Sequence, residues 1–216
     1  MANAHDLLMA QRAAMMGGKP LPYLRRVAYL EFPNTAWIDT CITFSDGVKL
    51  STRETFVNSG SRQLQGSNTS RQYYGVTAGG LIEFGALMVN ATNVQVDGET
   101  EYGIVYHVLN GSNICQVYLG EEKIFEKSGA YNLLSTSWKF GLITGYSSRM
   151  ATGYRNHGFK FENASGVLLS CIPVLDLSAR PCFYNEAPSA VPADDPSRFF
   201  YNESGVGEFT PGPNVT

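Results

Sequence analysis

Apolar and polar residues alternate along most of this chain with a period of two, which is typical of β-strands that bury one face. In residues 37–44, every second side chain from Ile38 to Phe44 falls on the same side, and the positions between them are polar or cysteine. A later stretch repeats the pattern, with Phe159 and Phe161 on one face. Many short strands separated by turns, with no helical period between them, predict an antiparallel β-sandwich.

The clearest hairpin signal lies in the middle of the chain. Residues 102–109 and 114–119 both read as strands, and the dipeptide Asn110-Gly111 between them readily adopts the positive φ values of a tight primed turn. The two residues that follow this dipeptide can lengthen the loop. A further turn then leads to a short third strand over residues 123–126.

A different kind of segment precedes the strands. Residues 3–16 read as a short helix, because Asn3 can cap it and Asp6 lies in its first turn, where the helix dipole favours a negative charge. A proline-containing linker follows. We therefore expect a helical segment with its linker over residues 1–22 and one β-domain over residues 23–216. The helix is either a frayed tail or a segment for attachment or oligomerisation.

Charge and hydropathy exclude several classes of partner. Only 16% of the 216 residues are charged and the formal net charge is −3, so the chain has no general attraction for nucleic acid or for an anionic membrane. No apolar run approaches the roughly 20 residues of a membrane-spanning helix. Asp6 and Arg12 interrupt the most apolar part of the N-terminus, which argues against an export signal and favours cytoplasmic synthesis.

The residues that commonly bind metals lack the spacing of a metal site. The four cysteines are not closely paired as in a zinc site, and Cys115 alternates with apolar residues like a buried free thiol. Cys171 and Cys182 would form a disulfide only if the chain turned back between them. The candidate calcium ligands lack the dense pattern of a calcium loop, and these are Asp39, Asp97, Asp176, Asp194 and Asp195. We expect no metal and no cofactor.

Several segments together resemble one family. Residues 29–40 read Tyr-Leu-Glu-Phe-Pro-Asn-Thr-Ala-Trp-Ile-Asp-Thr, residues 168–174 read Leu-Leu-Ser-Cys-Ile-Pro-Val, and residues 199–210 read Phe-Phe-Tyr-Asn-Glu-Ser-Gly-Val-Gly-Glu-Phe-Thr. These segments resemble the opening and closing motifs of small concanavalin A-like (laminin-G-like) jelly-roll proteins, many of them carried by prophages. The resemblance implies an all-β fold, an antiparallel two-sheet jelly-roll sandwich, preceded here by the short N-terminal helix. Residues 187–196 depart from the family pattern, as either a solvent-exposed extension or a ligand-contacting loop.

Some members of this superfamily are glucanases, which use a Glu-x-Asp-x-(x)-Glu motif on a strand. The comparable run here, residues 97–101, lacks the apolar spacing and reads better as a turn that enters a strand. No nucleophile elbow or other catalytic signature is present, and the histidines do not assemble a site in the sequence. A Ser-His-Asp arrangement is defined in space and stays open at this point. We expect a non-enzyme.

Carbohydrate binding is the remaining chemistry, because sugars stack on exposed aromatic rings and exchange hydrogen bonds with polar side chains. The candidate residues are Arg71, Tyr73, Tyr74, Tyr131, Asn132 and Tyr154, whereas Trp37 and Trp138 are expected in the core.

The leading hypothesis is a non-enzymatic module of phage or prophage type that is structural or recognises a receptor. Its partner would be a glycan or cell-surface receptor, neither nucleic acid nor membrane, and the N-terminal helix would serve attachment or homo-oligomerisation. This hypothesis would place the protein on a virion after cytoplasmic synthesis. The alternatives are a glycoside hydrolase or polysaccharide lyase of the same superfamily, and a purely architectural domain without a ligand.

Overall fold

The computed structural model describes residues 21–33, 35–57, 63–68, 72–85, 91–130, 136–142, 153–188 and 191–215. The expected helix over residues 3–16, and most of the linker that follows it, lie outside this part of the chain. No helix among the described residues is long and apolar enough to cross a membrane.

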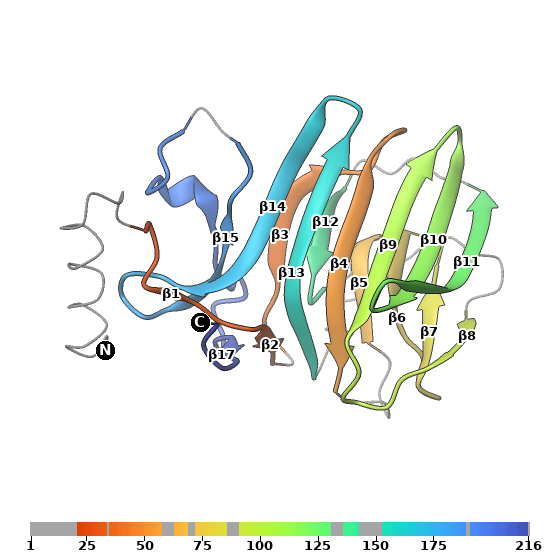
Figure 1. The fold of residues 1–216 in the computed structure, drawn as a ribbon, viewed down its shortest axis with the longest axis horizontal. Helices are drawn as coiled ribbons and strands as arrows, with labels where there is room; N and C mark the ends of the chain where they lie inside the picture. Colours follow the sequence, from red (N-terminus) through yellow and green to blue (C-terminus); the bar gives the residue numbers. More distant parts are fainter. Residues whose placement is uncertain are drawn as a thin grey trace.

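The described chain forms two antiparallel β-sheets, as the alternation predicts (Figure 1). The larger sheet contains β1 (Arg25–Arg26), β2 (Leu30–Phe32), β4 (Lys49–Phe56), β9 (Tyr102–Leu109), β10 (Ser112–Leu119), β11 (Glu122–Ala130), β13 (Tyr154–Asn163), β14 (Gly166–Leu175), β15 (Pro181–Asn185), β16 (Phe199–Phe200) and β17 (Thr210–Pro211). The smaller sheet contains β3 (Ile38–Thr43), β5 (Gln63–Asn68), β6 (Gln72–Val76), β7 (Leu81–Phe84), β8 (Ala91–Gln95) and β12 (Ser137–Phe140). A single 3₁₀ turn, η1 (Pro196–Arg198), precedes β16.

The order of the strands shows how distant parts of the chain meet. The main path of the larger sheet runs β11-β10-β9-β4-β13-β14-β15-β16, with β1 beside β14, β2 beside β13 and β17 beside β2. The smaller sheet runs β3-β12-β5-β6-β7-β8. Strand β17, near the end of the described chain, thus pairs with β2, near its beginning.

Aromatic side chains from both sheets meet in the interior of the sandwich. The ring centre of Trp138 in the smaller sheet lies 5.4 Å from that of Tyr106 in the larger sheet. The ring centres of Phe140, in the smaller sheet, and Phe159, in the larger sheet, are 4.5 Å apart. Burying each such ring stabilises the fold by about 1.5–3 kcal/mol. The expected core position of Trp138 is confirmed. Trp37, in contrast, is only half-buried, and the Lys139 ammonium lies 5.0 Å from its ring centre.

The central hairpin forms at Asn110-Gly111, as predicted. Both residues have positive φ, 51° and 72°, and Leu109 pairs directly with Ser112. The loop is therefore the two-residue turn alone, and Ser112 and the residue after it belong to β10 rather than to a longer loop. Strand β11 is also longer than the sequence pattern suggests, because it continues to Ala130.

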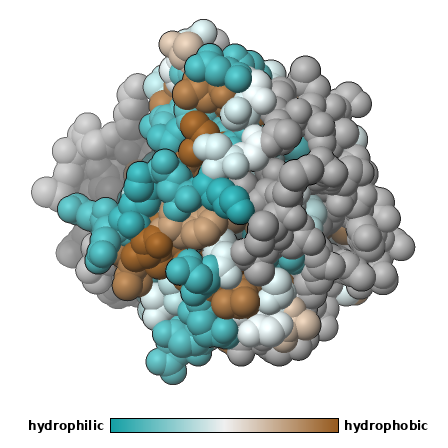
Figure 2. Space-filling model, turned by 90° about the vertical axis from the view of Figure 1, so that its right-hand side faces the viewer, coloured by the Kyte–Doolittle hydropathy of each residue, from teal (hydrophilic) through white to brown (hydrophobic). Residues whose placement is uncertain are grey.

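Strand β11 forms one edge of the larger sheet. Figure 2 shows this end of the molecule, where hydrophilic side chains are interspersed with smaller hydrophobic areas. The strand carries charged residues at Glu122, Lys123, Glu126 and Lys127, all of them exposed. Charges on an edge strand discourage pairing with another chain.

The four cysteines are free thiols. Cys171 and Cys182 lie on the paired strands β14 and β15. In the strand register, Cys182 pairs with Val174, three positions away from Cys171. Three residue positions along a strand correspond to about 10 Å. A disulfide requires Cα atoms within about 7 Å, so the strand register excludes this bridge.

Candidate functional site

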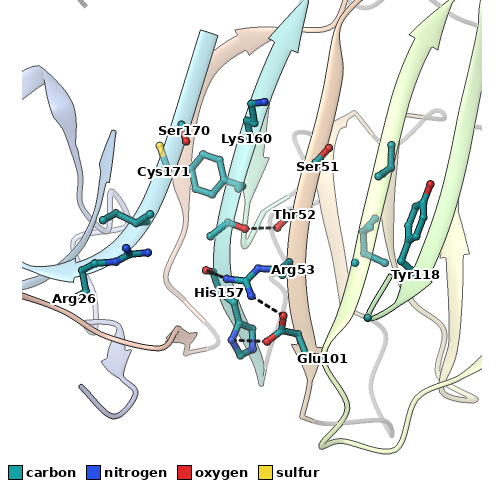
Figure 3. A pocket seen from close by; sticks show the side chains of 17 residues that line it. Arg26, Ser51, Thr52, Arg53, Glu101, Tyr118, His157, Lys160, Ser170 and Cys171 are labelled. Atoms are coloured by element: carbon teal, nitrogen blue, oxygen red, sulfur yellow. Dashed lines mark hydrogen bonds and ion pairs between the residues drawn. The ribbon is translucent and has the colours of Figure 1, made fainter. Parts of the chain in front are cut away.

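A hollow of about 580 Å³ opens on the outer face of the larger sheet, across β14, β13, β4, β9 and β10 (Figure 3). We call it the groove. Its floor includes Ser51, Gly103, Gly158 and Ser170, whose side chains are small or absent. Longer side chains surround this floor, and they are Arg26, Arg53, Glu101, Tyr118, His157 and Lys160. Small residues in the middle of a sheet face, with long ones around them, produce the depression.

The register explains why these residues meet. Lys160 pairs with Ser170 on one side and with Ser51 on the other, so all three lie in one row across three strands. In the neighbouring row, Gly103 lies between Arg53 and Tyr118. A Cβ atom on Gly103 would be 3.1 Å from the Cβ of Tyr118. This glycine therefore leaves room beside the tyrosine.

A β-bulge in β13 shapes one side of the groove. Asn156 pairs with Glu54 and Phe159 pairs with Thr52, so His157 and Gly158 together face the single residue between them on β4. The bulge allows Asn156 and Phe159 both to be buried, although they are three positions apart. Gly158 has a φ of +124°, and a Cβ there would be 2.9 Å from a backbone oxygen, so this position requires glycine.

The bulge places His157 in a hydrogen-bonded cluster beside the groove. Its Nδ1 lies 3.2 Å from Oε2 of Glu101, and its Nε2 lies 3.1 Å from Oγ1 of Thr55. Arg53 donates from Nη1 to Glu101 at 3.0 Å and from Nη2 to the His157 carbonyl at 3.3 Å (Figure 3). Burial, assisted by nearby Arg53, lowers the pKa of His157 against the opposing effect of Glu101, so the ring is neutral at pH 7. A neutral ring that donates from Nδ1 to the carboxylate accepts from the Thr55 hydroxyl at Nε2.

This connectivity matches that of a Ser-His-Asp triad, which the sequence left open. Thr55 holds the place of the nucleophile, but it is almost completely buried and does not line the groove. A substrate carbonyl would not reach its hydroxyl. The cluster therefore fixes the imidazole and the Arg53 guanidinium, and it offers no accessible nucleophile.

Tyr118 is the aromatic residue at the opposite side of the groove, and its orientation is also fixed. Its hydroxyl donates to Oε1 of Gln116 at 3.1 Å, and Nε2 of that glutamine donates to Glu126 at 2.7 Å. Lys123 forms an ion pair with the same carboxylate. Tyr118 itself is half-buried, so part of its surface is accessible.

The sequence-predicted binding residues do not line the groove. Arg71, Tyr131 and Asn132 lie outside the described residues. Tyr74 and Tyr154 are fully buried, with ring centres 5.6 Å from Trp138 and 4.4 Å from Phe32 respectively. Tyr73 is only 7% exposed. A sugar ring has no access to these three tyrosines as the structure places them.

The acidic run at residues 97–101 is a turn, as expected. Asp97 accepts hydrogen bonds from the backbone N–H groups of Glu99 at 2.9 Å and Thr100 at 2.8 Å. Only Glu101 of this run lines the groove, and it is the one carboxylate among the described lining residues. The paired carboxylates that a glycosidase requires are therefore not brought together in this groove.

Of the other aspartates considered as calcium ligands, Asp194 is exposed, and the remaining three serve local structure. Asp176 accepts from the backbone N–H groups of Ser178 and Arg180, and Asp195 caps η1. Asp39 forms an ion pair with Lys139. The described part of the chain contains no group of three His, Cys, Asp or Glu residues that could hold a metal ion. The described residues of the 187–196 insertion are largely exposed and do not line the groove.

Beneath the groove, a carboxyl group is buried in the sandwich interior. Glu54 of β4 has no exposed surface and receives hydrogen bonds from Tyr74, Gln65 and Asn156. Burial raises the pKa of Glu54 to about 7, and the hydrogen bonds partly offset this effect. Because the carboxyl is inaccessible from the groove, its role is internal.

No protein-family model and no curated protein matches this chain. The geometry of the groove and the sequence motifs are therefore the basis for a functional assignment. Sequence reasoning did not single out Arg53, Tyr118 or Lys160 as binding residues. The available signal was the alternation itself, which places them on the outer side of their strands.

Proposed function

We propose that this protein is a non-enzymatic β-sandwich of the concanavalin A-like jelly-roll type that binds carbohydrate in the groove on its larger sheet. The resemblance of its end motifs to small prophage-carried jelly rolls supports a role as a phage-type structural or receptor-recognising module. The two sheets and the pairing of β17 with β2 agree with a domain closed by its C-terminal segment.

The observation that supports the binding proposal is an accessible aromatic ring together with polar side chains around a shallow floor. The Tyr118 ring offers a surface for the C–H face of a sugar, and Arg53, Lys160 and Ser51 offer hydrogen-bonding groups to its hydroxyls. Because hydrogen bonds already hold Tyr118 and Arg53, little side-chain entropy is lost on binding.

The chemistry of the groove favours binding over catalysis. The hydroxyl that contacts His157 Nε2 is that of Thr55, which is buried, so the ring has no accessible nucleophile to activate as a general base. Glu101 has no second carboxylate beside it among the lining residues that the structure describes.

The test is binding of the purified chain to a panel of soluble polysaccharides, followed by titration calorimetry. Replacement of Tyr118 by Ala should weaken binding by about tenfold or more, because central aromatic residues commonly contribute at least 1.4 kcal/mol. Tyr118→Phe keeps the ring and should retain most of the affinity. Leu119→Ala alters the exposed neighbour on the same strand and should have no effect.

The same incubations distinguish the alternatives. New reducing ends or unsaturated sugar products would overturn the non-enzymatic assignment in favour of a hydrolase or lyase. Binding that is indifferent to Tyr118→Ala would overturn the groove as the site. If no polysaccharide binds, the architectural alternative stands instead.

A further inference from the structure

We infer that the groove selects anionic glycans whose charge is carried by carboxylate groups, as in uronic acid polymers. This inference rests on the proposed carbohydrate-binding function and specifies its ligand class. The groove is lined by the cations Arg26, Arg53 and Lys160, against which stands the single carboxylate of Glu101. The lining thus has an excess of positive charge in a chain whose formal net charge is −3.

Neighbouring carboxylates reduce this excess without cancelling it, and one of them is Glu186, which lies close enough to the lining residue Cys171 to add to the effect of burial in raising its pKa. Glu162 lies beside the groove, but it is shared by two ammonium groups, those of Lys49 and Lys160. One carboxylate between two lysines leaves a net positive charge on this side. His157 contributes no charge at neutral pH, because burial lowers its pKa.

Both arginines of the groove have N–H donors that a ligand can use. Arg53 is well exposed, and its ion pair with Glu101 and its bond to the His157 carbonyl use only part of its five N–H donors. Arg26 has no acidic partner among the described residues and stands on the far side of β13 from Tyr118 (Figure 3). A polymer crossing the groove from Tyr118 would therefore meet cations along its path.

Carboxylates suit this arrangement because the planar guanidinium binds them through two parallel hydrogen bonds. Exposed ion pairs are individually weak, at about 0–1 kcal/mol. Discrimination between charged and neutral sugars would consequently come from several contacts together, and it would decrease with salt.

The experiment compares polygalacturonate with its fully methyl-esterified form, which keeps the sugar and the linkage but removes the charge. Dextran and dextran sulfate form a second pair, in which the charge comes from sulfate. At low salt, polygalacturonate should bind about tenfold more tightly than the ester, and about 1 M salt, where the Debye length is about 3 Å, should remove most of this preference.

Two variants test the cations directly. Arg26→Gln and Lys160→Gln should each weaken binding of polygalacturonate by about two- to fivefold and binding of the ester by a smaller factor, because only the polymer with free carboxylates loses an ion pair. Lys127→Gln removes the same charge from β11 outside the groove and should have no effect. The thermal unfolding midpoint of each variant verifies that the fold is intact.

The outcomes separate the inference from the proposed function. Equal affinity for polygalacturonate and its ester, with binding still dependent on Tyr118, would overturn the anionic preference and leave carbohydrate binding in place. Binding of dextran sulfate in preference to polygalacturonate would overturn the assignment to carboxylates. If none of the four polymers and no member of the wider panel binds, both proposals fail.

Discussion

The hydroxyl of Tyr74, in the smaller sheet, donates a hydrogen bond of 2.5 Å to the carboxyl group of Glu54, in the larger sheet. This bond crosses the interior of the sandwich. Gln65, also in the smaller sheet, donates to the other carboxyl oxygen at 2.6 Å, so one side chain of β4 is held by two strands of the opposite layer. The two sheets are joined by directional polar contacts as well as by apolar packing.

The buried carboxyl predicts an unusual dependence of stability on pH. The pKa of Glu54 is about 7 in the folded protein and near 4.5 otherwise, so the folded state binds the proton more tightly. Its contribution is fully present below about pH 4.5 and is lost as the pH rises through 7, with a total of about 3 kcal/mol. Urea unfolding at about pH 5 and about pH 8 should show that Glu54→Gln removes most of this loss.

The comparison with Glu54→Gln is needed because the histidines act in the opposite sense. Burial lowers the pKa of both His107 and His157, so their contribution is lost as the pH falls. These effects are common to the wild type and the variant and cancel in the difference. Glu99→Gln, which changes an exposed carboxyl, serves as the control. A wild-type-to-variant difference that stays constant across this pH range would contradict the prediction.

Loss of the hydroxyl group should lower the stability of the protein at one buried tyrosine and not at another. Tyr74→Phe removes the bond to Glu54 and should lower the free energy of unfolding by about 1–3 kcal/mol. The hydroxyl of Tyr154 is buried without a hydrogen-bond partner in the described structure, so Tyr154→Phe should be neutral or slightly stabilising. Urea unfolding of the two variants at the same pH measures the contrast, and equal losses would refute it.

Thiol labelling should distinguish Cys41 from the other cysteines. Cys41 is exposed, whereas the other three are buried. Treatment of the native protein with a maleimide should add one label per chain, seen by intact mass, and unfolding should expose all four thiols. Labelling at Cys41 should be slow at neutral pH, because partial burial and then Asp39 and Glu203 raise the pKa of its thiol. Cys41→Ser should give no native labelling, and labelling of a buried cysteine would contradict the structure.

The sequence carried enough information for the layers of this fold but not for the side chains that face its surface. The Asn110-Gly111 turn was predictable because positive φ at two successive positions has few residue solutions. Tyr73 and Tyr74 were misleading because β6 is buried along its whole length, so it lacks the alternation that separates an inner from an outer face. Gly85 adds to this effect, since its missing side chain leaves space for the ring of Tyr73.

The groove was not predictable because no local motif encodes it. Its residues come from six strands of the larger sheet and from the turns that hold Glu101 and Gly120, and they become adjacent only through strand order and register. The bulge at His157 and Gly158 also reverses the phase of alternation within β13. A pattern read with a constant period of two therefore assigns one half of that strand to the wrong face.

The two ends of the described chain lie side by side at one end of the sandwich (Figure 1). The backbone N–H of Val215 donates to the carbonyl of Arg26 at 3.2 Å, and Val27 bridges Asn214. A mechanical load applied between these ends would break the neighbouring backbone hydrogen bonds one after another. Arg26 lies at the point where this load acts, whereas the strands β4, β9 and β10 lie outside the load path, so a molecule tethered under tension would lose one cation of the groove first and keep the Tyr118 side longest.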